Sequence, residues 1–132
     1  MGYLDVILAA VATFAFGAVY YMVLSKPWMA ASGVPVGDDG QPINSKNPVP
    51  YLVSFVMILL VAGMMRHTFA LGGIDTFFEA WTTGLGVGLF FITPWIFVNC
   101  GYSARPWSLA VIDGGYATIG CTIMGVVLYL LA

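Results

Sequence analysis

One acidic residue lies well inside an apolar stretch of this chain and is its first candidate for chemistry. If a helix begins near Pro106, a residue type suited to a first helical turn, Asp113 lies about 10 Å further along that helix. A charged aspartate near the middle of a bilayer costs roughly 2.5–3.5 kcal/mol. We therefore expect Asp113 to be protonated, hydrogen-bonded or paired. The partners available to it are Lys26, Arg105 and the neutral Asn99.

Asp113 has two interpretations, and the sequence leaves both open. In the structural one, it is a buried polar clamp that ties the last helix to the turn before it. In the functional one, its carboxylate binds a proton or an ion, as intramembrane acids do in pumps and transporters.

Polar and aromatic residues are expected to gather with this acid at one membrane surface. A lysine amine can reach the headgroups from inside the bilayer, and an indole ring prefers the interface. We call this candidate site for a lipid headgroup, a small ligand or a partner the rim; its members are Lys26, Trp28, Asn99, Arg105, Trp107 and Asp113. Tyr20, Tyr21 and Tyr51 are expected near the same surface.

A second cluster of charges lies at a short turn between two apolar stretches. Arg66 and His67 precede a glycine pair, and Asp75 and Glu79 follow it. Helix dipoles favour basic groups at a helix C-terminus and acidic groups at an N-terminus, so the pattern predicts an ion-paired turn. His67 is the single histidine, which excludes a metal site built from several histidines of one chain. His67 as the single axial ligand of a haem or chlorophyll is an alternative that the sequence leaves open.

No catalytic motif can be found in the sequence. It contains no HExxH, no CxxC and no set of residues arranged as a Ser–His–Asp triad. Asp113 has no evident second acid, base or metal ligand beside it. We therefore expect no enzyme activity, no bound metal and no cofactor.

Four long apolar stretches must position these residues. Hydrophobic residues make up 61% of the 132 residues and charged residues only 8%, and a spanning helix needs about 20 mostly apolar residues. The sequence predicts an all-α integral membrane protein, a single domain over 1–132 with four transmembrane helices in an up-down bundle. The helices are expected at about 5–24, 51–71, 77–98 and 107–131. No run of Lys or Arg is present to bind nucleic acid.

The long connection over 25–50 is the one segment with polar character. Its five prolines and three glycines are expected to block a regular helix and to mark successive turns. The segment is expected either as a strap over one face of the bundle or as a lid over a cavity between helices.

Basic residues beside the helix ends predict the orientation. Lys26, Lys46 and Arg105 lie on the side of the two loops, against Arg66 on the other side. We expect a bacterial inner-membrane protein with loops 25–50 and 99–106 in the cytoplasm and both termini in the periplasm.

Small residues recur at helical spacing and are candidates for close helix packing. Helices associate in lipid through close contact, because lipid tails compete equally for apolar side chains. The candidate packing residues are Gly17, Gly84, Gly88, Gly114 and Gly125. They either pack the helices of one chain together, or the Gly84/Gly88 stripe faces a second subunit. Pro94 is expected to kink the third helix.

Short motifs over almost the whole chain resemble a known family. They are Gly17-Ala18-Val19-Tyr20-Tyr21, Lys26-Pro27-Trp28-Met29, Pro50-Tyr51, the stretch from Gly84 to Pro94, Asn99, Arg105-Pro106-Trp107 and Ile112-Asp113-Gly114-Gly115-Tyr116. With these motifs the chain resembles the bacterial four-helix membrane proteins grouped as domain of unknown function 1761. The loop after Met29 departs from the family, in which charged sequence is common there. The resemblance implies a four-helix fold and no assigned activity.

The sequence favours a non-enzymatic role that depends on helix packing. Its short extramembrane segments and glycine stripes are typical of a small accessory or assembly subunit that packs, within the bilayer, with itself or with a larger membrane complex. One alternative is an oligomeric ion or proton channel, or a small transporter, that uses Asp113. Another alternative is a lipid-binding or pigment-binding protein.

Overall fold

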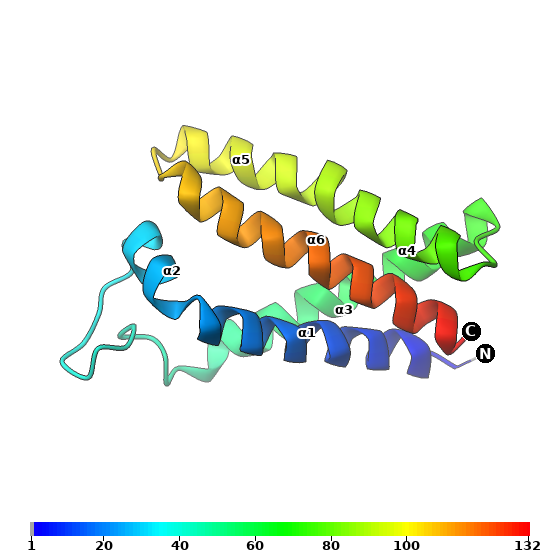
Figure 1. The fold of residues 1–132 in the computed structure, drawn as a ribbon. Helices are drawn as coiled ribbons and strands as arrows, with labels where there is room; N and C mark the ends of the chain where they lie inside the picture. The colour runs from blue at the N-terminus through cyan, green and yellow to red at the C-terminus, as the bar shows by residue number, and fades with distance from the viewer. Residues whose placement is uncertain (1) are drawn as a thin grey trace.

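The computed structural model describes residues 2–132, and helices make up most of them (Figure 1). In chain order the elements are α1 (Leu4–Val23), α2 (Ser25–Ser32), α3 (Pro48–Gly72), α4 (Phe77–Gly86), the π-helical η1 (Val87–Ile92), α5 (Thr93–Tyr102) and α6 (Trp107–Leu130). The helices α4, η1 and α5 follow one another without a break. The all-helical prediction is confirmed for the described residues.

Four helices are long and apolar enough to cross a membrane. They are α1, α3, the continuous α4–η1–α5 and α6, with 20, 25, 26 and 24 residues. The third continues to Tyr102, four residues beyond its predicted end at Val98. The prediction of four membrane-spanning helices, and with it that of an integral membrane protein, is confirmed by their length and composition.

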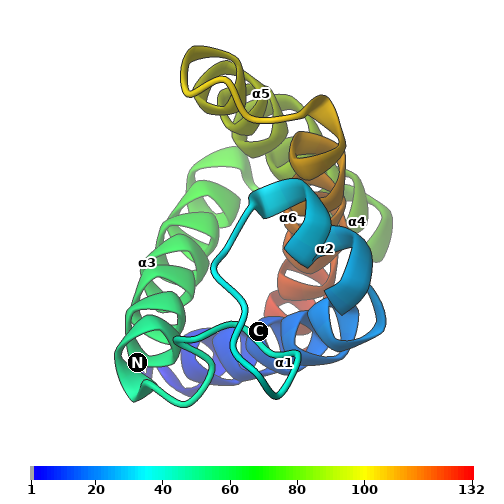
Figure 2. The same cartoon turned by 90° about the vertical axis from the view of Figure 1, so that its left-hand side faces the viewer.

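The last helix holds most of the others together. α6 packs along α1 on one side and along α4, η1 and α5 on the other, whereas α3 packs chiefly on α1 and touches α6 only lightly. Figure 1 shows both termini at the same end of the molecule and successive spans running alternately away from that end and back to it. In Figure 2, α3 lies at the left, α1 at the bottom, α6 at the right and α5 at the top.

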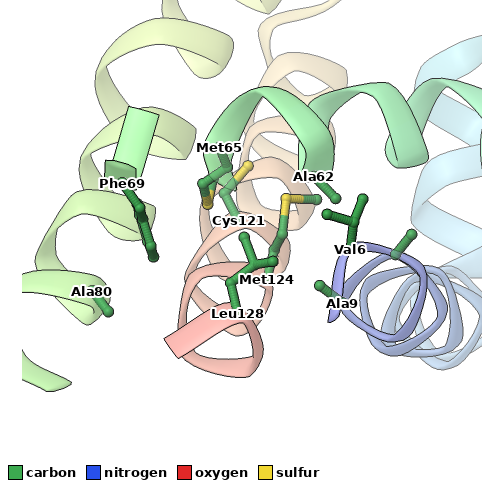
Figure 3. Close-up of a cluster of buried hydrophobic side chains, with 10 residues drawn as sticks. Val6, Ala9, Ala62, Met65, Phe69, Ala80, Cys121, Met124 and Leu128 are labelled. Carbon is green, nitrogen blue, oxygen red and sulfur yellow. The ribbon is translucent and has the colours of Figure 1, made fainter. Parts of the chain in front are cut away.

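The core lies towards the end that carries the termini. Side chains of α1, α3, α4 and α6 meet there, and Met124 is its largest fully buried side chain (Figure 3). Ala9, Ala10, Ala62 and Ala80 are completely buried. These small side chains let the helix backbones approach closely, which is how helices associate in lipid.

The glycine stripe of the third span contacts α6 of the same chain. A Cβ atom added to Gly84 would lie 2.5 Å from the Cys121 carbonyl oxygen, and one added to Gly88 would overlap the Ala117 carbonyl oxygen. Of the two interpretations of this stripe, the structure has the intrachain one, because Gly84 and Gly88 both face the α6 backbone. An α6 backbone already fills the position that a partner helix would need.

The other three candidate packing glycines also lie against neighbouring helices of the same chain. A Cβ atom added to Gly17 of α1 would lie 2.7 Å from the Tyr116 ring, and one added to Gly114 would lie 2.6 Å from the Thr93 methyl group. Gly125 faces the Ala80 carbonyl oxygen at 2.9 Å.

A π-helical turn precedes the proline in the third span. Pro94 stands in the first turn of α5, directly after η1. The Thr93 hydroxyl donates to the Gly88 carbonyl oxygen at 2.7 Å and to that of Gly114 on α6 at 3.1 Å. Where the sequence predicts a kink, the structure has a wider helical turn that a threonine hydroxyl ties to α6, an adjustment typical of prolines inside membranes.

The first third of the long connection is helical, which corrects the prediction of turns throughout 25–50. Pro27 fits inside α2 because it stands in the first turn, where a backbone N–H needs no partner. Gly33 then ends the helix with a φ of 68°, in the left-handed region that glycine adopts without strain. The remaining residues, 33–47, run as a loop to Asn47, whose side chain caps α3 by accepting from the Val49 amide at 3.1 Å.

Candidate functional site

A partly open cavity of about 820 Å³ lies where α1, α2, α3, α6 and the loop come together. The elements that line it come together at the end of the molecule opposite the termini, where the loop leads from α2 to α3 (Figure 1 and Figure 2). Besides tyrosine and tryptophan, its polar lining comes from α2, α3, α6 and the loop: Ser25, Gln41, Asn44, Ser45, Ser54 and Asp113. The loop therefore contributes to the lining of a cavity between helices.

Asp113 is joined to the first helix at this cavity. The Tyr21 hydroxyl on α1 donates a hydrogen bond of 2.7 Å to Asp113 Oδ1 on α6. One residue earlier on each helix, the Tyr20 hydroxyl donates to the Ile112 carbonyl oxygen at 2.6 Å. The expected clamp between the last helix and the turn before it is thus wrong in its partner, because Asp113 ties α6 to α1.

Aromatic rings surround this hydrogen bond. Tyr116, one turn after Asp113, stacks on Tyr20 with ring centroids 6.0 Å apart and meets Tyr21 edge-on at 5.4 Å. Trp28 of α2 meets Tyr21 from the other side at 6.1 Å, also edge-on. Trp28, Tyr21, Tyr116 and Asp113 all line the cavity. A carboxylate is therefore held among several aromatic side chains.

The structure divides the predicted rim. Trp28 and Asp113 meet at the cavity, whereas Arg105 Nη1 donates to the Ser32 carbonyl oxygen, the last residue of α2, at 2.9 Å. Trp107 stacks on Phe97 with ring centroids 6.0 Å apart, outside the cavity.

The two remaining rim residues face outward. Lys26 and Asn99 are exposed, and within residues 2–132 neither side chain makes an ion pair or a hydrogen bond. The cations that the sequence offered to Asp113 are thus not its hydrogen-bond partners. Arg105 instead fastens α2, which forms one wall of the cavity.

Sequence reasoning missed several residues of the cavity. Gln41, Asn44 and Ser45 lie in a loop without periodicity, and only the chain path brings them to the cavity. Tyr116 had a usable signal, because a residue three positions after Asp113 lies on the same face of a helix. Tyr21 was expected near this surface, but no pattern in the sequence indicated its bond to Asp113.

The predicted ion-paired turn is not formed by the residues expected. Arg66 Nε lies 3.3 Å from Asp5 Oδ2 of α1, and Nη1 donates to the Gly2 carbonyl oxygen at 3.1 Å. Glu79 accepts instead from the Thr76 hydroxyl at 2.7 Å, while its own amide donates to Thr76 Oγ1 at 3.2 Å. Thr76 is therefore the N-cap of α4, and its hydroxyl also binds the Glu79 side chain.

The remaining two residues of that cluster, His67 and Asp75, are exposed, and they form no ion pair within the described part of the chain. The prediction was wrong because the acid that pairs with Arg66 is Asp5 of α1, which is far from Arg66 in the sequence. The cluster is a structural contact between α1 and α3.

The described residues hold no group of three or more His, Cys, Asp or Glu side chains that could bind a metal ion. The side chains that line the cavity can take part in ligand recognition. A carboxylate can accept hydrogen bonds or attract a cation, aromatic faces can contact a cation or an apolar group, and the loop supplies neutral polar atoms.

Comparison with known proteins identifies a family and no closer relative. No curated protein and no solved structure is similar enough to match the chain. Residues 4–129 match the family described as Protein of unknown function (DUF1761), which covers nearly the whole chain and includes every element of the cavity. The chain belongs to this family of proteins of unknown function.

Proposed function

We propose that this protein is a non-enzymatic integral membrane protein that binds a small amphipathic molecule between its helices. The observation that carries the proposal is the cavity of about 820 Å³ with a single acid among aromatic and neutral polar groups. Ligand sites in proteins measure roughly 300–1,000 Å³ and combine an apolar lining with a few polar groups that fix orientation.

The lining supports a ligand with one polar and one apolar end. Phe14, Ala18 and Met22 of α1 and Met29 of α2 give it apolar walls, while Asp113 and the loop residues give it polar ones. A molecule from the membrane or its surface would satisfy both parts at once.

The wall formed by α2 and the loop is suited to hold such a ligand in place. α2 carries Trp28 into the cavity lining, and Arg105 fastens the end of α2 through the Ser32 carbonyl oxygen. Holding a binding wall in position before the ligand arrives lowers the entropy lost on binding.

The proposal includes a location and an orientation. Four spanning helices in an up-down arrangement would place α2, the loop and the α5–α6 turn at one membrane surface. Three of the four Lys and Arg residues, Lys26, Lys46 and Arg105, belong to that side. The basic residues support a cytoplasmic location for it in a bacterial inner membrane, with both termini in the periplasm.

A matched pair of cavity variants tests the binding function. Ala18→Phe would place a phenyl ring in the cavity lining, whereas Val19→Phe places the same ring at a neighbouring residue that is 59% exposed and outside the cavity lining. We expect native mass spectrometry in mild detergent to find a small molecule retained by the wild type and Val19→Phe but lost from Ala18→Phe. Equal retention by all three proteins, or no saturable binding of any added octyl amphiphile, would contradict the proposal.

An accessory or assembly subunit is the second candidate. Phe90, Phe91 and Trp95 of the third span are 72%, 69% and 67% exposed and present aromatic rings to the bilayer or to a partner helix. The same mass spectra test this role, since copurifying protein subunits would support docking with itself or with a larger complex. Small-molecule loss from Ala18→Phe alone would favour the binding function instead.

A further inference from the structure

The charge of the cavity points to the chemical class of its ligand. Asp113 is the only ionisable acid or base among the cavity-lining residues other than tyrosine, and all of these residues belong to the described part of the chain. Arg105, the nearest arginine along the chain, donates outside the cavity to the Ser32 carbonyl oxygen. A cation entering the cavity meets an acid with no lysine or arginine in the lining, whereas an anion is repelled by that acid.

The aromatic side chains add a second preference for positive charge. Tyr21, Trp28, Tyr51 and Tyr116 line the same cavity as the acid. The ring centroid of Tyr21 lies 6.1 Å from that of Trp28 and 5.4 Å from that of Tyr116. The three rings are therefore close enough to contact one small group. Aromatic faces attract organic ammonium ions, most strongly where water is excluded.

We infer that the ligand is an amphipathic organic ammonium ion, whose head lies between the Asp113 carboxylate and these rings. Its apolar part would run along Phe14, Ala18, Met22 and Met29, which line the same cavity. The inference rests on the proposed binding function and specifies the substrate class of that site.

A bare alkali cation fits the cavity less well than an organic one. Such an ion needs several oxygen ligands close together. The lining has neutral oxygens on α2, α3 and the loop, but Asp113 is its one carboxylate, and the Tyr21 that binds Asp113 packs against the Trp28 and Tyr116 rings. An organic ammonium ion needs fewer direct oxygen contacts, because its methyl or methylene groups contact the rings.

Three probes with the same apolar chain and different heads test the inference. Octyltrimethylammonium, octyl glucoside and octyl sulfate are titrated calorimetrically into the full chain in a maltoside detergent, with blank titrations into micelles alone. We expect the ammonium probe to bind about tenfold more tightly than octyl glucoside, and octyl sulfate to bind more weakly than both.

A charge-matched pair of variants assigns this preference to the cavity acid. Asp113→Asn is expected to remove the tenfold preference for ammonium over octyl glucoside. Asp75→Asn removes the same charge at an exposed residue outside the cavity and is expected to bind all three probes like the wild type. If Asp113→Asn does not fold, Trp28→Leu is expected to weaken ammonium binding selectively, and Trp28→Phe to retain it.

The outcomes distinguish this inference from the proposed function. Suppose that octyl glucoside binds and that Ala18→Phe abolishes this binding. If the wild type then shows no preference for ammonium, or if Asp113→Asn keeps that preference, the ammonium assignment alone is overturned. Displacement of the ammonium probe by sodium or potassium chloride, but not by choline chloride at equal ionic strength, overturns it in favour of a metal cation. If no probe binds in a way that Ala18→Phe abolishes, both the inference and the proposed function fail.

Discussion

The Tyr21 hydroxyl and the Asp113 carboxylate, 92 residues apart, share a hydrogen bond of 2.7 Å that joins the first spanning helix to the last. The bond lies in the cavity lining, so the same contact fixes the fold and orients the acid of the candidate site. A carboxylate held by a neutral donor keeps its charge available, whereas an arginine or lysine partner would neutralise it.

Tyr21→Phe is expected to lower the free energy of unfolding by about 0.6–1.7 kcal/mol, which runs from the average to the largest value measured for hydrogen bonds between membrane helices. Unfolding by a denaturing detergent, followed by circular dichroism, measures the change. Tyr102→Phe serves as the control, because Tyr102 is 92% exposed and contributes no hydrogen bond from its hydroxyl within residues 2–132. An unchanged stability in Tyr21→Phe would show that the hydroxyl does not support the fold.

Gly88→Ala is expected to destabilise the protein by about 1–3 kcal/mol, the typical cost of adding a methyl group to a closely packed interface. The added Cβ would overlap the α6 backbone at Ala117, which cannot move aside as a flexible side chain could. Thermal unfolding in detergent measures the effect.

Gly86→Ala, in the same span, supplies the matched control for that substitution. A Cβ at Gly86 meets nothing within 4 Å, so stability is expected to stay level or to rise by up to about 1 kcal/mol. If Gly88→Ala instead left stability unchanged and dissociated an oligomer, the intrachain packing of this stripe would be refuted.

Asp5 and Arg66 are expected to show a coupling energy of about 0.5–1 kcal/mol in a double-mutant cycle with Asp5→Asn and Arg66→Gln, as exposed ion pairs do. Their charged atoms lie 3.3 Å apart, and both side chains keep some exposure. Detergent unfolding of the four proteins in the cycle measures the coupling. The cycle with Asp75→Asn in place of Asp5→Asn is expected to give none, and coupling there would restore the ion-paired turn.

Arg105→Gln is expected to loosen α2 without affecting α6. The substitution weakens the hydrogen bond to the Ser32 carbonyl oxygen, worth about 1 kcal/mol, so amides 28–33 should exchange with solvent roughly fivefold faster. Hydrogen exchange followed by mass spectrometry measures this. Lys26→Gln removes an exposed charge from α2 itself and should leave the exchange of these amides unchanged. Equal acceleration in both variants would assign the effect to net charge.

The sequence by itself determined the class of the protein and the approximate bounds of its spanning helices. Runs of about 20 apolar residues have few alternatives to a membrane helix, because the backbone must satisfy its own hydrogen bonds in lipid. The bounds of the last span, predicted at 107–131 and observed at Trp107–Leu130, illustrate how directly composition fixes them. The third span ran past its predicted end because Asn99 and Tyr102 continue a helix outside the apolar run.

Only the tertiary structure decided which residues meet. Asp113 was recognised as the candidate acid from its cost in lipid, but its partner Tyr21 depends on how α1 packs against α6. The same holds for Arg66, whose acid comes from α1 and not from the adjacent turn, and for Gly84, whose close neighbour is the α6 backbone. Hydropathy reports the transfer of each segment into lipid, whereas contacts between helices depend on rotation and register, which side-chain packing sets for the whole chain together.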